Sequence, residues 1–494
     1  LKRKKMQKTE QSLKLKIVNA ICGSGKSYKL KQYIKTNPDK RILIAVPTHE
    51  LASQTQSDLQ KLGIPAYHNQ VDNGESATRS LINALDDDFG RNVVIVTHEC
   101  LLHFCLYAYR DEKTQNKLSL FDIYIDEIPS AWYGAEIDYK DEEYRDSNFP
   151  FLGWLEERDG LRFVRDEDRE KFLAYYESEH ANSKLLKQAL FALLTGQGML
   201  LEEDKYFFSF TANPILYSAL WAKSFTVLGA NVGISEFAYA AKTILNTEIT
   251  LADDELQPDL MRHVHTDTKR IELIPVFSQK CTKKLLSEHY SDILNGTRRA
   301  LRDGFIYTSN KDEEHNKGFY YASRADDVLE GGERVSMASY GLNHFQHLHK
   351  AAFLGCANLD GTTIGHWRKY CNLNGWDWRE LEEKRQAALN YEKVYQFVSR
   401  CSVRVRGNNN KQIYIVPDVS CAEYLKQHYF PDALIKPEMI TTEKKKRDTS
   451  KGDTTLEIVK NYLEQGLKPK QIAQLTGLEA RYISNLKLKF KKAA

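Results

Sequence analysis

Residues 20–27 hold the first set of side chains whose types and spacing could do chemistry. Ala20 is followed by four residues and then by the triplet Gly25-Lys26-Ser27, directly after an apolar stretch. Glycines at 23 and 25 would let backbone N–H groups turn toward a polyphosphate without a Cβ in the way. Lys26 would then reach the β and γ phosphates, and Ser27 would hold Mg²⁺. The residues that we assign to nucleotide binding here are Gly23, Ser24, Gly25, Lys26 and Ser27.

Two acidic residues, Asp126 and Glu127, end an apolar stretch that begins at Leu120. Asp126 would hold Mg²⁺, usually through water, and Glu127 would take a proton from the water that attacks the γ phosphate. Adjacent carboxylates end many strands by chance, but this pair follows a phosphate-binding loop with apolar strands in between. The pair therefore predicts hydrolysis of ATP in addition to its binding.

A third polar set lies in the second half of the chain. Gln396, Arg400 and Arg404 fall within residues 395–404, which precede an apolar stretch at 412–416. Because the two arginines are four residues apart, a helix would place both on one face. Two arginines at this spacing often form only a surface face, so their meaning depends on the motifs around them.

The elements that must position these residues are apolar stretches that predict buried strands. The stretch 41–46 runs into Pro47-Thr48 and then Glu50-Leu51-Ala52, and the stretch 93–96 ends in Thr97-His98. In this order, the motifs of residues 14–420 resemble those of superfamily 2 (DEAD/DEAH-like) helicases. The resemblance implies that Thr48 and Thr97 contact nucleic-acid phosphates. It also implies that Gln396, Arg400 and Arg404 reach across a cleft between two lobes, where the arginines neutralise charge on the γ phosphate.

Other motifs of that family are matched more loosely. Residues 304–311 resemble the fourth motif and offer Asn310 to nucleic acid, and residues 335–343 resemble the fifth, with Gly341 at the nucleotide. Asn343 stands where the family often has Asp, so a role that needs the charge is in doubt. For the third, coupling motif there are two candidates, 209–213 and 228–231. We prefer the second because it ends a β-rich run and opens an amphipathic segment; its residues are Gly229, Ala230 and Asn231.

The resemblance and the patterning together predict an α/β fold with two RecA-like parallel-sheet lobes, a helical insertion in the first, and a small all-α helix-turn-helix domain. Residues 131–205 are acidic, aromatic and helical in pattern, and we interpret them as the insertion. The predicted divisions are a basic tail at 1–13, lobe 1 at 14–255, lobe 2 at 256–435, a charged linker at 436–453 and the helix-turn-helix domain at 454–494.

The C-terminal segment is the basic part of the chain. From residue 444 onward 13 Lys and Arg stand against 5 Asp and Glu, a balance of +8 that leaves about −5 for the rest of a chain whose net charge is +3. Ala473, Gly477 and Ile483 have the spacing of a helix-turn-helix, and the segment resembles the trihelical DNA-binding domains of resolvases and invertases. A second helix over 479–489 would offer Arg481, Ser484, Asn485 and Lys487 to duplex DNA. The competing interpretation is a small helical bundle that contacts protein.

Composition agrees with a large, cytoplasmic enzyme, which by analogy with other appended DNA readers we expect in a bacterial or phage-infected cell. The chain has 494 residues, 42% of them hydrophobic, and no apolar stretch long enough to span a membrane. Its basic first residues do not resemble a signal peptide, and its eight scattered cysteines suit a reducing compartment. His98, Cys100, His103 and Cys105 do not have the spacing of a zinc motif, and we interpret them as part of a packed helix.

These observations predict an ATP-dependent DNA helicase or translocase that its tail recruits to DNA, as in replication of a phage or mobile element, with replication proteins as partners. A single strand would lie across both lobes, and duplex DNA would bind the tail. Two alternatives stay open: a DNA-binding initiator or regulator that ATP switches without unwinding, and an RNA helicase. Cys22 lies inside the phosphate-binding loop, so chemical modification of this thiol should block nucleotide binding.

Overall fold

The computed structural model describes residues 13–70, 76–86, 92–139, 145, 148–181, 183–202, 205–258, 263–312, 321–337, 344–359, 361–405, 407–441, 459–460, 462–463, 467–476, 483–484 and 486–487. The chain forms two compact units, Leu1–Ile440 and Thr441–Ala494. The described helices include none with the length and apolar character that crossing a membrane requires.

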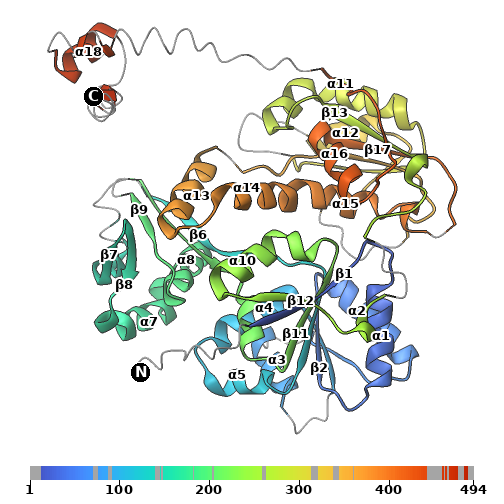
Figure 1. Ribbon diagram of the computed structural model, residues 1–494, viewed down its shortest axis with the longest axis horizontal. Coiled ribbons are helices and arrows are strands. Elements are labelled where there is room, and N and C mark those ends of the chain that lie inside the picture. The colour runs from blue at the N-terminus through green and yellow to red at the C-terminus, as the bar shows by residue number, and fades with distance from the viewer. Residues whose placement is uncertain are drawn as a thin grey trace. The chain divides into compact units, whose positions relative to one another are not determined.

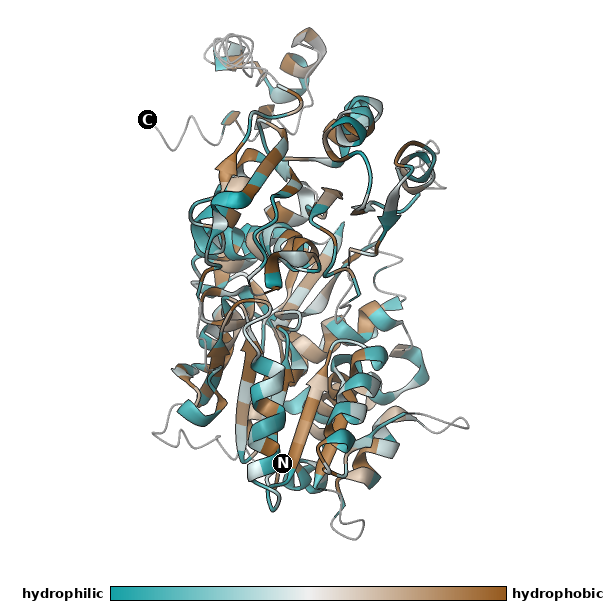
Figure 2. Ribbon diagram, turned by 90° about the vertical axis from the view of Figure 1, so that its right-hand side faces the viewer, coloured by the Kyte–Doolittle hydropathy of each residue, from teal (hydrophilic) through white to brown (hydrophobic). Residues whose placement is uncertain are grey.

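The first lobe is built on a seven-stranded parallel sheet in the order β12-β1-β11-β5-β2-β4-β3 (Figure 1). Its inner strands are continuous apolar runs; all five positions of β2 and of β4 are buried, as expected for a sheet covered on both faces (Figure 2). The strands are β1 (Lys14–Asn19), β2 (Ile42–Val46), β3 (Tyr67–His68), β4 (Val93–Thr97), β5 (Asp122–Asp126), β11 (Ser224–Gly229) and β12 (Glu248–Leu251). Helices of this lobe include α1 (Lys26–Thr36), α2 (His49–Lys61), α3 (Ala77–Ala84), α4 (His98–Ala108), α5 (Glu112–Leu118) and α10 (Glu236–Leu245).

The second lobe holds a six-stranded parallel sheet in the order β15-β14-β16-β17-β13-β18. Its strands are β13 (Ile271–Phe277), β14 (Phe305–Ser309), β15 (Gly332–Arg334), β16 (Lys350–Leu354), β17 (Gln412–Asp418) and β18 (Leu434–Ile435). Its helices include α11 (Lys283–Leu301), α12 (Tyr321–Val328), α15 (Glu392–Val398) and α16 (Val419–His428). Two parallel sheets with helical connections confirm the predicted α/β fold of two RecA-like lobes.

The segment between β5 and β11 differs from the helical insertion that we predicted. It contains helices α7 (Arg169–Glu177) and α8 (Lys184–Leu194), but also an antiparallel sheet in the order β6-β10-β9 and a β7-β8 hairpin. The strands are β6 (Trp132–Asp138), β7 (Leu155–Arg158), β8 (Leu161–Val164), β9 (Leu200–Glu202) and β10 (Tyr206–Ala212). β10, which follows the predicted end of the insertion, pairs with β6 along its whole length. Its run of aromatic residues fits a pleated, half-buried surface better than a helix.

Helices α13 (Gly361–Asn374) and α14 (Trp378–Gln386), which we call the bridging helices, leave the second lobe between β16 and β17 and pack on the insertion (Figure 1). The rings of Trp132 and Trp376 are stacked with centroids 5.7 Å apart. The Tyr370 hydroxyl lies 2.8 Å from the carbonyl oxygen of Gly198 and 3.0 Å from that of Phe210. No motif in the sequence indicates this connection, because the helices belong to the second half of the chain.

The C-terminal unit contains helix α18 (Pro469–Thr476). Val459, Ile472, Ile483 and Leu486 form one buried apolar cluster in it, against which Ala473 packs; Ala473 and Ile483 are two of the positions on which the helix-turn-helix prediction rests. Of the residues predicted to read DNA, Lys487 is exposed and Ser484 is half-buried, while Arg481 and Asn485 lie outside the described residues. The helix-turn-helix arrangement therefore stays a prediction.

Candidate nucleotide-binding cleft

The phosphate-binding loop joins β1 to α1, as the sequence predicts. Gly23 and Gly25 have φ angles of 81° and 94°, which L side chains rarely adopt, so both positions require glycine. The Lys26 ammonium donates to the carbonyl oxygens of Ala20 and Ile21, at 2.7 and 3.0 Å. The loop thus holds its own lysine, which must turn outward to meet a phosphate.

Ser27 and Asp126 lie side by side, because α1 begins at Lys26 and β5 ends at Asp126. The Ser27 hydroxyl donates to Oδ2 of Asp126 at 2.8 Å. Burial raises the pKa of Asp126, and the hydrogen bond from Ser27 opposes that rise. A hydroxyl and a carboxylate are oxygen ligands that Mg²⁺ accepts beside phosphate and water, so this pair fits the predicted metal site.

Glu127 follows the end of β5 in a left-handed conformation, with φ of 67°. Its backbone N–H donates to the carbonyl oxygen of Leu228 near the end of β11, at 2.9 Å. Burial raises the pKa of its carboxyl, and the positive charge of Lys26 partly opposes this. A raised pKa brings a carboxylate closer to the range in which it accepts a proton from water at neutral pH.

Helix α15 brings the second lobe against the loop. The Gln396 amide donates to Oε2 of Glu127 at 3.2 Å, and its carbonyl oxygen lies 3.3 Å from the Cys22 sulfur. The Tyr395 hydroxyl accepts from the backbone N–H of Cys22 at 2.9 Å. Sequence reasoning found Gln396 but assigned no role to Tyr395, because a buried aromatic residue carries no motif of its own.

Arg400 and Arg404 both face the cleft, although the predicted reason was wrong. α15 ends at Val398, and Arg404 lies in a separate 3₁₀ turn, Ser402–Arg404, so the two arginines do not share a helix face. They nevertheless line a cavity of about 630 Å³ together with the phosphate-binding loop and the acidic pair. The approach is close: a Cβ at Gly23 would lie 2.7 Å from the Cβ of Arg404.

The two candidates for the coupling motif lie in different places. Ser209–Asn213 begins within β10 of the insertion, where the Ser209 hydroxyl donates to Gly198. Gly229, by contrast, accepts from the N–H of Ala20 in the phosphate-binding loop, and Ala230 and Asn231 line the adjoining pocket. Asn231, with φ of 54°, donates to the Tyr429 hydroxyl at 2.7 Å and to Glu392 at 3.3 Å. This position favours the preferred candidate, since it connects the loop to the second lobe.

Glu392 of the second lobe accepts hydrogen bonds at the contact between the lobes, a role that the sequence did not indicate. Its carboxylate accepts from the hydroxyls of Tyr424 and Tyr429 as well as from Asn231. Burial raises its pKa, and these hydrogen bonds lower it. A glutamate in an amphipathic helix is usually a solvated residue, so only the fold identifies it as a link between lobes.

Thr48 and Thr97 both cap helices at the carboxyl edge of the first sheet. The Thr48 hydroxyl accepts from the N–H of Leu51, and that of Thr97 from the N–H of Cys100. Beside them the ring of His98 lies 3.0 Å from the carbonyl oxygen of Asp126. Burial lowers the pKa of His98 to about 4, so the ring is neutral at pH 7. His98 thereby connects the Thr97 loop to the metal-site strand.

The structure gives less support to the roles predicted for the remaining site residues. Asn310 is only 8% exposed, and its side-chain oxygen accepts from the N–H of Cys356, so the structure does not favour the predicted contact with nucleic acid. Gly341 and Asn343 lie outside the described residues. The described part of the chain contains no group of three His, Cys, Asp or Glu that could hold a metal by itself. Cys100 and Cys105 are buried, while His103 pairs with Glu99.

The chain is similar to several solved structures and, over part of its first lobe, to one protein family. In structure the chain is similar to Xpd4 of S. tokodaii, with 12% identity, a TM-score of 0.44, and coverage of 86% of this chain and 96% of that one. It is also similar to Mss116p bound to ssRNA and AMP-PNP, with 11% identity, a TM-score of 0.37, and coverage of 96% and 80%. A search of curated proteins found no match. Residues 7–129 match the family model of the DEAD/DEAH box helicases. The matched segment contains the phosphate-binding loop, Thr48, Thr97 and the pair Asp126-Glu127.

Proposed function

We propose that the chain is an ATP-dependent DNA helicase or translocase, which couples ATP hydrolysis to movement along a strand. The observation that carries the proposal is the hydrogen bond from Gln396 to Glu127. It joins the hydrolytic side chain of one lobe to the helix that leads into the arginines of the other. A nucleotide in this cavity would therefore contact both lobes, and its hydrolysis would change how they meet.

Each side chain of the cleft has a definite task. Lys26 turns from the loop carbonyls to the phosphates, and Arg400 and Arg404 neutralise the charge that develops there. Gln396 orients and Glu127 deprotonates the attacking water. Mg²⁺, when bound, would withdraw charge from the phosphates, and Ser27 and Asp126 are the residues to hold it. Opening of the cleft would then shift a strand that the Thr48 and Thr97 edge holds.

The C-terminal unit would recruit this motor to duplex DNA. Its basic balance supports a nucleic-acid partner, and the exposed side chain of Lys487 is available to a phosphate. We include in the proposal a role in replication of a phage or other mobile element, together with its replication proteins. That part rests on the analogy of an appended DNA reader alone.

The test is the nucleic-acid dependence of ATP hydrolysis by the full chain. Turnover is measured alone and with single-stranded DNA, single-stranded RNA or duplex DNA, and strand displacement is followed on a tailed duplex. The proposal expects stimulation by single-stranded DNA together with displacement. ATP-dependent duplex binding without displacement would instead establish the switched regulator, and stimulation by RNA alone would establish the RNA helicase.

The recruitment step has its own test. In the full chain, Lys487→Glu should weaken binding to duplex DNA and leave hydrolysis stimulated by single strands unchanged. Unchanged duplex binding would remove Lys487 from the proposed reading surface.

A further inference from the structure

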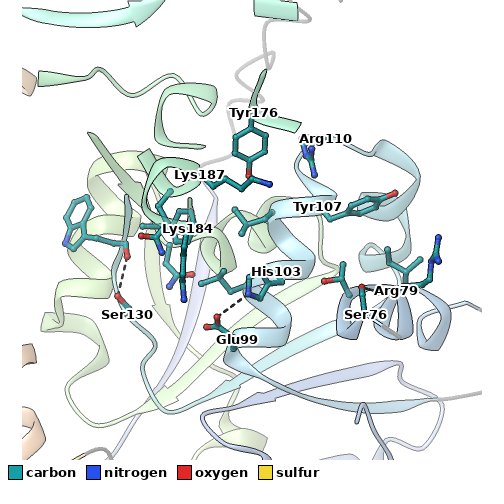
Figure 3. Close-up of a pocket in the computed structure, with 18 of the residues that line it drawn as sticks. Ser76, Arg79, Glu99, His103, Tyr107, Arg110, Ser130, Tyr176, Lys184 and Lys187 are labelled. Atoms are coloured by element: carbon teal, nitrogen blue, oxygen red, sulfur yellow. Dashed lines mark hydrogen bonds and ion pairs between the residues drawn. The ribbon is translucent and has the colours of Figure 1, made fainter. Parts of the chain in front are cut away.

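A second large pocket lies where α3 and α4 of the first lobe face the insertion (Figure 3). Its volume is about 1180 Å³, and it shares no lining residue with the nucleotide cavity. α3 and α4 form one wall, and α7, α8 and β6 of the insertion form the other. Nothing in the hydrolytic reaction uses this space.

Positive charge comes to the pocket from both walls. Arg79 on α3 and Lys184 on α8 are exposed, and Lys187 on α8 is partly exposed. Among the described residues none of these three side chains forms an ion pair. The described lining also contains Arg110, which forms an ion pair with Glu177 outside the lining. The one carboxylate in the described lining is that of Glu99, which lies 3.1 Å from His103. The pocket therefore attracts an anion with several charged groups.

Aromatic rings lie among these cations. Tyr107 is 43% exposed, and Tyr133 and Tyr176 also line the pocket. The Arg110 guanidinium lies over the Tyr176 ring at 5.3 Å and near that of Tyr107 at 6.0 Å. Of these rings Tyr107 is the exposed one, while Tyr133 is partly exposed and Tyr176 is buried. An exposed tyrosine ring beside Lys and Arg suits single-stranded nucleic acid, because a base can stack on the ring while phosphates pair with the cations. The bases of a duplex have no free faces for such stacking.

The position of α4 connects the pocket to the edge of the sheet. Thr97 caps this helix, and Glu99, His103 and Tyr107 follow on the face that lines the pocket. A strand that touches the capped N-terminus of α4 would continue along this face toward Lys184 and Lys187, which Figure 3 shows on the far wall.

We propose that this pocket binds a single-stranded segment of nucleic acid between the first lobe and the insertion. The inference rests on the proposed function and adds to it a task for the insertion, which becomes one wall of the strand's path. Tyr107 would stack on a base, and Arg79, Lys184 and Lys187 would pair with phosphates.

The first test reverses the charge of the insertion wall in the full chain. Lys184→Glu/Lys187→Glu is compared with Lys242→Glu/Lys426→Glu, which changes the same charge at two exposed lysines outside the pocket lining. Fluorescence anisotropy measures affinity for labelled dT and U oligonucleotides across salt concentrations. The loss of two phosphate contacts should reduce the steepness of log affinity against log salt concentration, here called the salt slope, by about 1.4. The affinity at 0.1 M salt should fall by about 25-fold. The control pair should stay near the wild-type affinity and slope.

The second test locates the strand directly. An oligonucleotide with 5-iodouracil is irradiated with the wild-type chain, and mass spectrometry should find the adduct on Tyr107; Tyr107→Ala should remove it. Two results would overturn the proposed strand site. One is a Lys184→Glu/Lys187→Glu variant with the affinity and salt slope of the wild type, and the other is an adduct that forms only at residues other than Tyr107. If an acidic peptide displaced the oligonucleotide without any Tyr107 adduct having formed, the site would be a peptide site. Failure of the wild-type chain to bind either oligonucleotide would instead contradict the proposed function, so the two failures are distinct.

Discussion

Substituting Gly23 by alanine tests whether the two lobes must meet at the phosphate-binding loop. The φ of 81° at Gly23 would strain any L side chain by about 1–2 kcal/mol. The added Cβ would also lie 2.7 Å from the Cβ of Arg404 and 3.1 Å from its carbonyl oxygen. Favourable carbon contacts need about 3.5–4.0 Å. Because part of the obstacle is backbone, the Arg404 segment must retreat by about 1 Å.

Gly25→Ala is the matched control, since Gly25 has a φ of 94° but no atom within 4 Å of an added Cβ. Backbone strain should weaken ADP binding by about 5- to 30-fold in both variants. Only Gly23→Ala should displace the arginines, and a 1 Å misplacement can lower kcat by about 100-fold. Steady-state ATPase assays and fluorescent ADP titrations measure the two quantities. Equal kcat values for the two variants would refute the inference that this contact aligns the cleft.

Three further substitutions or modifications test the same cleft. Lys26→Ala should abolish hydrolysis and leave duplex binding by the tail intact; surviving turnover would contradict the assignment of the loop. Because burial raises the pKa of Glu127, wild-type kcat/KM should fall with decreasing pH at a higher pH than the pKa of an ordinary glutamate. Glu127→Gln should lower kcat by about 10²- to 10⁴-fold and remove this limb of the profile; an unchanged profile would exclude Glu127 as the base. Burial also raises the pKa of Cys22, so its alkylation should accelerate as pH rises and stop hydrolysis when complete. Full ATPase activity after complete modification would argue against a nucleotide beside this thiol.

The two sheets could be predicted because their strands carry the signal within themselves. β2 and β4 are buried at every position, and a parallel sheet makes such strands continuous apolar runs between polar turns. The insertion was harder to predict. β6 and β10 are separated by more than sixty residues, and pairing at that distance leaves no local pattern that distinguishes a strand from an aromatic helix.

The candidate site also contains some residues that could be predicted from the sequence and others that could not. Lys26, Ser27 and Asp126 could be predicted because loop and strand ends place them by local geometry. Arg400 and Arg404 were identified by resemblance, yet the helix that was to align them ends at Val398. Glu392 could not be recognised, because its partners Asn231, Tyr424 and Tyr429 come from two lobes. Long-range hydrogen bonds have no signature in a single sequence.

The bridging helices give the lobes a second attachment besides the one at the phosphate-binding loop. Arg385 of α14 donates to Glu236 of the first lobe at 2.7 Å, and Glu236 also accepts from the Trp132 indole at 2.8 Å. The Arg385 guanidinium lies 3.9 Å from the centre of the Trp367 ring, and each such ring contact adds about 0.5–1.5 kcal/mol beyond area burial. At the cleft the lobes meet through hydrogen bonds around α15 and through Ile21, Cys22 and Ala230, which pack into the apolar core of the second lobe. Opening of the cleft would therefore be a rotation about the aromatic contact between the bridging helices and the insertion. The insertion would keep its place against the bridging helices, while Arg400 and Arg404 move away from the phosphate-binding loop.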